Sequence, residues 1–326
     1  MIIGRELRAW VENREGQRLT RLAAQALSDR WAEGPVHTAF ERAMAAVPAR
    51  TAEAVGETMR ALFSDDGWVD RLIDTLADAM RRDPYFEPPF RHLNSALHGG
   101  LVVYEDDLVS VAAGVCSLTQ LAARKSAPRQ GGSISFSGQL SVIKFVKAGG
   151  ARLGFWEAPR IDQDFSAANA GRCARVAERG VADGEILTVD GRHQSYIIEH
   201  AATNLVVLQA VVKVDHAPVS VEYDASSGDF VACSAADDSA SRIQMITTLL
   251  RKLDCEAAAA TMITFLDHPS FFVRWHVMRD LLGIDVEVAL PHLRRMAARD
   301  PHPEVRQAAR ATLDLVEGGT IRNKAA

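Results

Sequence analysis

Cysteine is scarce in this chain, and its spacing excludes several chemistries. The 326 residues include only four cysteines. No two of them form a Cys-x-x-Cys pair, so the sequence indicates neither a zinc knuckle nor a redox pair. We expect them to be buried free thiols. They are Cys116, Cys173, Cys233 and Cys255.

Long apolar runs and an excess of positive charge are also missing. No stretch of about 18 uncharged apolar residues occurs, which excludes a membrane-spanning helix at the level of sequence. The N-terminus turns charged at Arg5 and Glu6, before any apolar core of signal-peptide length, so we expect a cytoplasmic protein. The formal net charge of −5 makes nucleic acid an unlikely partner, because phosphate binding needs clustered positive charge.

Complete catalytic motifs are absent as well. The chain has no Gly-x-Ser-x-Gly nucleophile elbow, no phosphate-cradling P-loop and no Gly-x-Gly-x-x-Gly dinucleotide fingerprint. Whether the protein is an enzyme therefore stays open at this level.

The periodicity of the apolar residues changes twice along the chain and predicts an α+β fold in three parts. Helical 3–4 spacing dominates residues 1–98, alternating spacing and Gly-rich turns dominate 99–236, and helical spacing returns over 237–317. We expect an N-terminal helical region, a central antiparallel β-sandwich or barrel and a C-terminal helical stack. Residues 318–326 lack a core pattern, so we expect a disordered tail.

Two similar sequence blocks occur in the C-terminal helical part. Asp267-His268-Pro269 precedes Val273-Arg274, and Asp300-Pro301-His302-Pro303 precedes Val305-Arg306. We align Asp267 with Asp300, and expect each aspartate to cap a helix or to bond a neighbouring arginine. This quarter of the chain resembles short HEAT repeats. The helical period predicts helices at about 256–266, 270–283, 286–299 and 303–316. The resemblance implies that these helices stack in pairs and that the partner is a peptide or protein.

A polar row is expected in the β-region. Asp190-Gly191 favours a type I′ turn, which would pair Glu185 with Tyr196, and the next connection would place Tyr196 opposite Gln209. Gln194 would share that face, and Arg192 could clamp an anionic group. Because both faces of the predicted sheet are largely apolar, it should be covered on both sides or closed. Its polar row is then the candidate ligand pocket, with an internal hydrogen-bond network as the alternative.

The β-region also weakly resembles the cupin superfamily, a double-stranded β-helix. Cupins bind metal through a His-x-His motif followed by a glutamate, and here His193-Gln194-Ser195 precedes Glu199. Serine replaces the second histidine. The resemblance implies a possible Fe(II) site at His193 and His200, although seven residues separate them and a regular strand points them to opposite faces. Ligands from separate strands, such as His92, His98 or His216, stay possible.

These patterns favour a recognition protein with a HEAT-like docking surface for a peptide or protein and a pocketed cupin-like β-domain. The first alternative is a non-haem iron oxygenase or hydroxylase that modifies a docked peptide. The second is a structural oligomerisation protein. The sequence does not reveal the oligomeric state.

Overall fold

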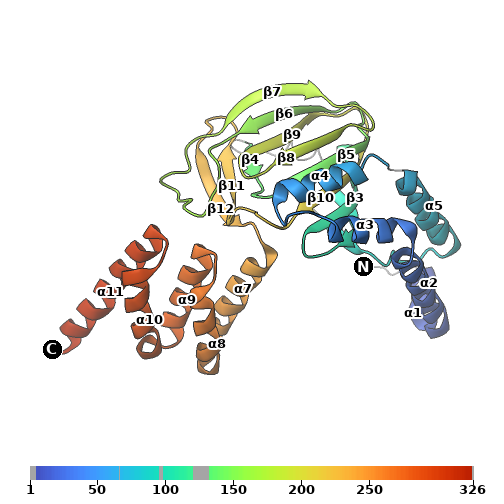
Figure 1. The fold of residues 1–326 in the computed structure, drawn as a ribbon. Coiled ribbons are helices and arrows are strands. Elements are labelled where there is room, and N and C mark those ends of the chain that lie inside the picture. The colour runs from blue at the N-terminus through green and yellow to red at the C-terminus, as the bar shows by residue number, and fades with distance from the viewer. Residues whose placement is uncertain (1–4, 66, 95–97, 120–131, 325–326) are drawn as a thin grey trace. The chain divides into compact units, whose positions relative to one another are not determined.

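The computed structural model describes residues 5–65, 67–94, 98–119 and 132–324. Its class is α+β, as predicted: N-terminal helices, antiparallel sheets and C-terminal helices follow one another along the chain (Figure 1). The chain divides into two compact units. Unit 1 comprises 1–131, 139–157 and 175–216, and unit 2 comprises 132–138, 158–174 and 217–326. Within the described ranges, no helix is both long and apolar enough to cross a membrane.

Unit 1 begins with helices whose starts follow ordinary capping rules. Asn13 Oδ1 accepts from the Gly16 N–H at 2.9 Å, and Thr51 Oγ1 accepts from the Ala54 N–H at 3.3 Å. Pro35 stands at the first turn of its helix, where no N–H partner is needed. The helices are α1 (Arg5–Glu12), α2 (Arg14–Ala32), α3 (Pro35–Ala45), α4 (Ala52–Leu62) and α5 (Gly67–Arg82).

The proline-rich segment after α5 leaves the helical conformation, as its three prolines require. Its aromatic residues pack inward. Phe86 is buried, and Phe90 meets Trp31 edge-on with ring centroids 5.7 Å apart. The segment therefore ties the helices to the start of the sheet.

Two sheets of unit 1 follow. The larger has the order β1-β2-β3-β10-β5-β8, and the smaller has the order β7-β6-β9. Their strands are β1 (Arg91–Asn94), β2 (His98–Glu105), β3 (Val109–Cys116), β5 (Leu140–Lys147), β6 (Arg152–Glu157), β7 (Ala174–Gly180), β8 (Ile186–Asp190), β9 (Gln194–His200) and β10 (Leu205–Val212).

The six-stranded sheet is covered on both faces, which confirms the expectation drawn from its apolar residues. One face packs against the helices, through a cluster that joins Val142 and Leu208 to Val55 and Met59 of α4. Gly56 permits this approach, since a Cβ there would lie 2.8 Å from the Leu140 side chain. The other face packs against β6 and β9 through a second cluster. That cluster includes Cys116, Ile143, Phe145, Leu153, Leu205 and Val207, with Tyr196 and Ile198 packed on it.

The predicted hairpin between β8 and β9 is wrong. β8 pairs with β5, whereas β9 pairs with β6 in the smaller sheet. The turn closes with the His193 N–H donating to the Asp190 carbonyl at 3.0 Å, so its central residues are Gly191 and Arg192. Gly191 lacks the positive φ of a type I′ turn. The chain uses this turn to cross from one sheet to the other.

Unit 2 combines a small sheet with the C-terminal helices. The sheet has the order β12-β11-β4, formed by β4 (Ser133–Phe136), β11 (Val219–Asp224) and β12 (Phe230–Ala235). The helical elements are α7 (Asp238–Lys252), the 3₁₀ turn η1 (Glu256–Ala258), α8 (Ala259–Thr264), the 3₁₀ turn η2 (Phe265–Asp267), α9 (Phe271–Ile284), α10 (Val286–Arg299) and α11 (Pro303–Lys324). The four helices expected after residue 255 match these bounds closely, apart from the 3₁₀ turns that flank α8.

The two ends of this stack differ in character. On α7, the exposed residues Met245, Ile246, Leu249 and Leu253 follow helical spacing and form an apolar outer stripe. The buried side of α7 carries Ala240 and Thr247. At the other end, α11 continues to Lys324, past the residue at which we expected order to stop. The three-part domain division stays a prediction.

Candidate functional site

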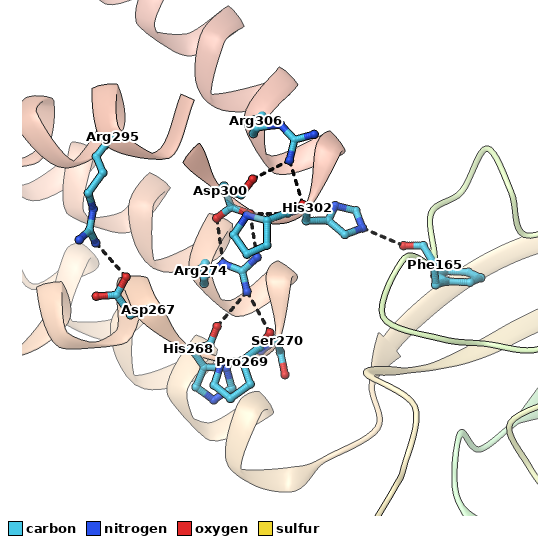
Figure 2. Close-up of polar contacts among 11 residues, drawn as sticks. Phe165, Asp267, His268, Pro269, Ser270, Arg274, Arg295, Asp300, His302 and Arg306 are labelled. Carbon is cyan, nitrogen blue, oxygen red and sulfur yellow. Dashed lines mark hydrogen bonds and ion pairs between the residues drawn. The ribbon is translucent and has the colours of Figure 1, made fainter. Parts of the chain in front are cut away.

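The two repeated blocks form equivalent loops at the starts of α9 and α11, and one arginine holds each loop (Figure 2). Arg274 Nη1 donates to the carbonyls of His268 and Pro269, both at 2.9 Å. Arg306 Nη1 donates to the carbonyls of Asp300 and Pro301 at 2.6 and 2.8 Å. In both cases the arginine bonds the residues six and five positions before it. The arginine of each Val-Arg pair therefore holds its own loop in place.

Arg274 also joins its repeat to the next. Its Nε donates to Asp300 Oδ2 at 2.8 Å, and its Nη2 donates to Asp300 Oδ1 at 2.7 Å. The two side chains are 6% and 3% exposed, so this bidentate pair is buried. The His302 N–H donates to the same carboxylate at 2.9 Å. The aspartate thus closes the turn that precedes α11 and binds an arginine of the neighbouring repeat, the second of the two roles that the sequence had suggested.

The structure corrects which residues are equivalent. His268, not Asp267, occupies the position of Asp300, because its Nδ1 accepts from the N–H two residues later, that of Ser270, at 3.1 Å. Asp267 lies one residue before that position. Its Oδ1 accepts from Arg295 Nη2 at 2.9 Å on the surface. From His268 to Arg274 and from Asp300 to Arg306 the two blocks have the same length, so the alignment on the two aspartates was off by one residue.

A cavity of about 460 Å³ opens between these two loops. Its other wall is one face of α10, because His292, Arg295, Met296 and Arg299 follow the spacing i, i+3, i+4, i+7. The loops contribute Pro269 and Pro301, and the Arg274–Asp300 pair lies at its side. A volume of this size is within the range of ligand pockets.

The loop before α11 is further fixed by aromatic stacking. The ring of His302 lies parallel to that of Phe271, with centroids 3.9 Å apart and an interplanar angle of 8°. Its Nε2 lies 3.3 Å from the carbonyl oxygen of Phe165 (Figure 2). His302 is buried, so this contact ties the 158–174 segment of unit 2 to the stack.

Comparison with known families agrees with this repeating geometry. Residues 230–314 match the HEAT repeats family. The match covers α7 to α11, the part of the chain that carries the loops and the cavity, and we call it the HEAT stack. No curated protein matches the chain.

Solved structures similar to the chain include two that are described as cupins. A cupin domain from Bordetella pertussis Tohama I is 14% identical, with 37% of this chain and 99% of that chain covered and a TM-score of 0.23. A sugar phosphate isomerase of the cupin superfamily from Silicibacter pomeroyi is 12% identical, with 45% and 82% covered and a TM-score of 0.23. Ectoine synthase from P. lautus is 6% identical, with 37% and 68% covered and the same TM-score. The cupin resemblance suggested by the sequence recurs here, but likenesses this slight say nothing of function.

Two residues of the predicted polar row, Tyr196 and Gln209, face the apolar cluster between the two sheets of unit 1, although their strands do not pair with each other. Tyr196 lies opposite Phe155 in the smaller sheet and packs on the cluster between the sheets. Gln209 pairs with Ala112 and Ile143 in the larger sheet, and alternation puts it on the Val207 face of that cluster. Burial raises the pKa of Tyr196 to about 12. The predicted face is confirmed for both residues, while the predicted pairing is wrong.

The other predicted ligand-binding residues have protein partners. Glu185 accepts from Arg179 Nη1 at 2.6 Å and from the Ala182 N–H at 3.0 Å. Burial would raise the pKa of Glu185, but these two bonds hold it below its ordinary value. Gln194 Nε2 lies 3.4 Å from Glu157 Oε1.

Arg192 is buried and tightly held. Its guanidinium donates to both Asp190 oxygens, at 2.7 and 2.9 Å, to Glu53 Oε1 at 2.5 Å and to the Asp215 carbonyl at 3.2 Å. The side chain is 7% exposed. Arg192 thus anchors α4 to the turn between the sheets.

The two histidines proposed as metal ligands lie apart. His193 precedes β9 and places its Nδ1 3.4 Å from Asp190 Oδ2, whereas His200 is the last residue of that strand and is exposed. The side chain of His98 lies outside the described residues. In the described portions of the chain, no three His, Cys, Asp or Glu residues converge closely enough to hold a metal ion. Among the described residues, His193 and His200 do not meet at one metal position, and iron binding stays a prediction.

The sequence-based reasoning missed the α10 wall. A usable signal existed, because His292, Arg295 and Arg299 repeat at helical spacing next to Met296. The spacing alone could not show that this face turns toward two proline-bearing loops.

Proposed function

We propose that this chain recognises a protein partner by binding a peptide segment of it in the cavity between the loops of the HEAT stack. One observation carries the proposal: the cavity walls are fixed before any ligand arrives. The loop carbonyls, the Arg274 guanidinium and the Asp300 carboxylate are linked in one continuous set of hydrogen bonds. A site that is already ordered loses little conformational entropy on binding, which favours affinity.

The family match supports the same conclusion. Helical repeat stacks build extended surfaces that mainly hold other macromolecules. The cavity lies within residues 230–314, the segment that matches HEAT repeats. Its size suits a few side chains of a docked segment better than a whole folded surface.

Panning a random-peptide display library against the full chain tests the proposal. Hydrogen exchange with and without a selected peptide should then show slower exchange at 266–269 and 292–301. Replacement of His292 by tryptophan, which reduces the free volume of the cavity, should weaken the selected peptides. The matched control is Arg294→Trp, because Arg294 is exposed on the same helix but outside the cavity lining. Failure to select any peptide, or protection elsewhere only, contradicts the proposal.

We further propose a small-molecule site between the two sheets of unit 1, at Tyr196 and Gln209. The support is that neither side chain forms a hydrogen bond to another residue in the described part of the chain, although both face an otherwise apolar cluster. Polar groups in such surroundings need a partner, which a ligand or water can supply. Native and denaturing mass spectra of the purified protein test this. An extra mass lost on denaturation, and reduced in Tyr196→Phe, is expected. Identical masses contradict a retained ligand.

A further inference from the structure

The charges around the HEAT-stack cavity do not cancel, and the surplus is positive. Arg274 and Asp300 neutralise each other in their buried pair. Arg295 and Asp267 pair at the rim, 52% and 75% exposed. Arg299 is the third arginine of the lining, and no residue of the described ranges forms an ion pair or hydrogen bond with its side chain. One guanidinium is therefore available to a ligand.

His268 adds no further positive charge to this surplus. Burial lowers the pKa of His268 below its ordinary 6.5, so its ring is neutral at pH 7. Its Nδ1 is already used by the Ser270 N–H. No carboxylate other than Asp267 and Asp300 lines the cavity among the described residues. Arg299 therefore sets the charge that the cavity prefers.

Apart from His292, the remaining lining is apolar. Leu266 and Met296 are buried, and Pro269 and Pro301 stand on the two loops. These groups offer a surface for an aliphatic or aromatic side chain within the same 460 Å³ space. A ligand that satisfies the whole cavity thus carries a negative group next to an apolar one.

We infer that the cavity selects an acidic segment of the partner protein, in which an Asp or Glu carboxylate binds Arg299 and an adjacent apolar side chain packs on Met296 and the two prolines. This inference rests on the proposed function. A guanidinium presents two parallel N–H groups to a carboxylate, a geometry that an ammonium lacks. One surplus charge balances a carboxylate, whereas a phosphate dianion would require a second unpaired cation.

Peptides selected from a random display library against the full chain provide the probe. The expected result is enrichment of Asp or Glu beside an apolar residue. Arg299→Ala should weaken the selected peptides about tenfold or more, which corresponds to a hydrogen bond to a charged group. Arg299→Lys should retain part of the affinity, because it keeps the charge and loses the planar fork. Arg294→Ala, an exposed arginine of α10 outside the lining, should change it less than about twofold.

Three outcomes separate the inference from the proposal beneath it. Acidic peptides that depend on Arg299 support both. Peptides that protect the cavity from hydrogen exchange, but lack acidic enrichment or bind Arg299→Ala normally, overturn the inference and leave the docking site standing. Failure to select any peptide overturns both. Circular dichroism of each variant checks folding, which the exposed position of Arg299 should preserve.

Discussion

Arg274 and Asp300, which come from neighbouring repeats 26 residues apart, form a buried ion pair with two hydrogen bonds of 2.8 and 2.7 Å. The same arginine holds the loop of its own repeat, and the same aspartate bonds the backbone of the turn just before the helix of the next. A single pair therefore connects loop geometry, helix start and repeat stacking, and it shapes one side of the cavity.

Removal of Arg274 should destabilise the HEAT stack strongly. Arg274→Ala leaves the Asp300 carboxylate buried without its partner, which typically costs about 3–5 kcal/mol. Urea unfolding followed by circular dichroism should show early loss of helical signal while β-sheet signal persists. The matched control is Arg295→Ala, which breaks only the exposed pair with Asp267 and should cost less than about 1 kcal/mol. Equal losses in the two variants would show that burial of the first pair does not matter.

Acid should weaken unit 1 at the turn between its sheets. Burial would raise the pKa of Asp190, but the side-chain and backbone hydrogen bonds from Arg192, with its charge, hold the pKa below the ordinary 3.8. A carboxyl with a depressed native pKa stabilises the fold above the unfolded pKa, near 3.9, and this contribution is lost as pH falls through the native value. Asp190→Asn should lower the unfolding free energy by about 2 kcal/mol at pH 7. It should also flatten the decline below about pH 4, measured by urea unfolding at several pH values. A decline as steep as in the wild type would assign the acid effect to other groups.

Tyr196 should titrate only in strong alkali. Burial raises its pKa to about 12, so the neutral phenol is favoured in the native state. Its contribution to stability is complete below the unfolded pKa, near 10, and is lost as pH rises toward 12. Absorbance at the phenolate band should show one fewer group ionising near pH 12 in Tyr196→Phe. Since the hydroxyl has no hydrogen-bond partner among the described residues, this variant should lose no more than about 1 kcal/mol at pH 7. Cooperative unfolding of Tyr196→Phe at pH 7 would instead assign the hydroxyl a structural role.

The outer stripe of α7 should tolerate truncation. Leu249 is 54% exposed, whereas Leu281 of α9 is fully buried in the HEAT-stack core. Leu249→Ala should change the unfolding free energy by less than about 0.5 kcal/mol, while Leu281→Ala should cost about 2–5 kcal/mol. Chemical unfolding of both variants makes the comparison. A large loss from Leu249→Ala would mean that its side chain is covered in solution.

Local sequence patterns were sufficient to predict the C-terminal helices of this protein. The helices from α8 to α11 begin close to where periodicity, caps and prolines predicted them, because each depends on residues within a few positions. Two strands, β7 and β4, carry little local signal. β7 is exposed along its length and lacks the alternation that marks a half-buried strand, and β4 is only four residues long.

The candidate sites could be predicted only in part. Alternation correctly put Tyr196 and Gln209 on an inward face, because the two-residue period is a property of any strand. It could not reveal that β8 and β9 belong to different sheets, so the expected row of Glu185, Tyr196 and Gln209 on adjacent strands does not form.

The sequence by itself determined the α+β class, the repeat with its two Val-Arg pairs and the apolar faces, since these follow from spacing along the chain. Tertiary structure alone decided that His268 corresponds to Asp300, that Arg192 is held by α4 and its own turn, and that α10 directs Arg299 and Met296 at two proline loops. Those relations join residues distant in sequence. They depend on how helices and sheets pack, which no local pattern specifies.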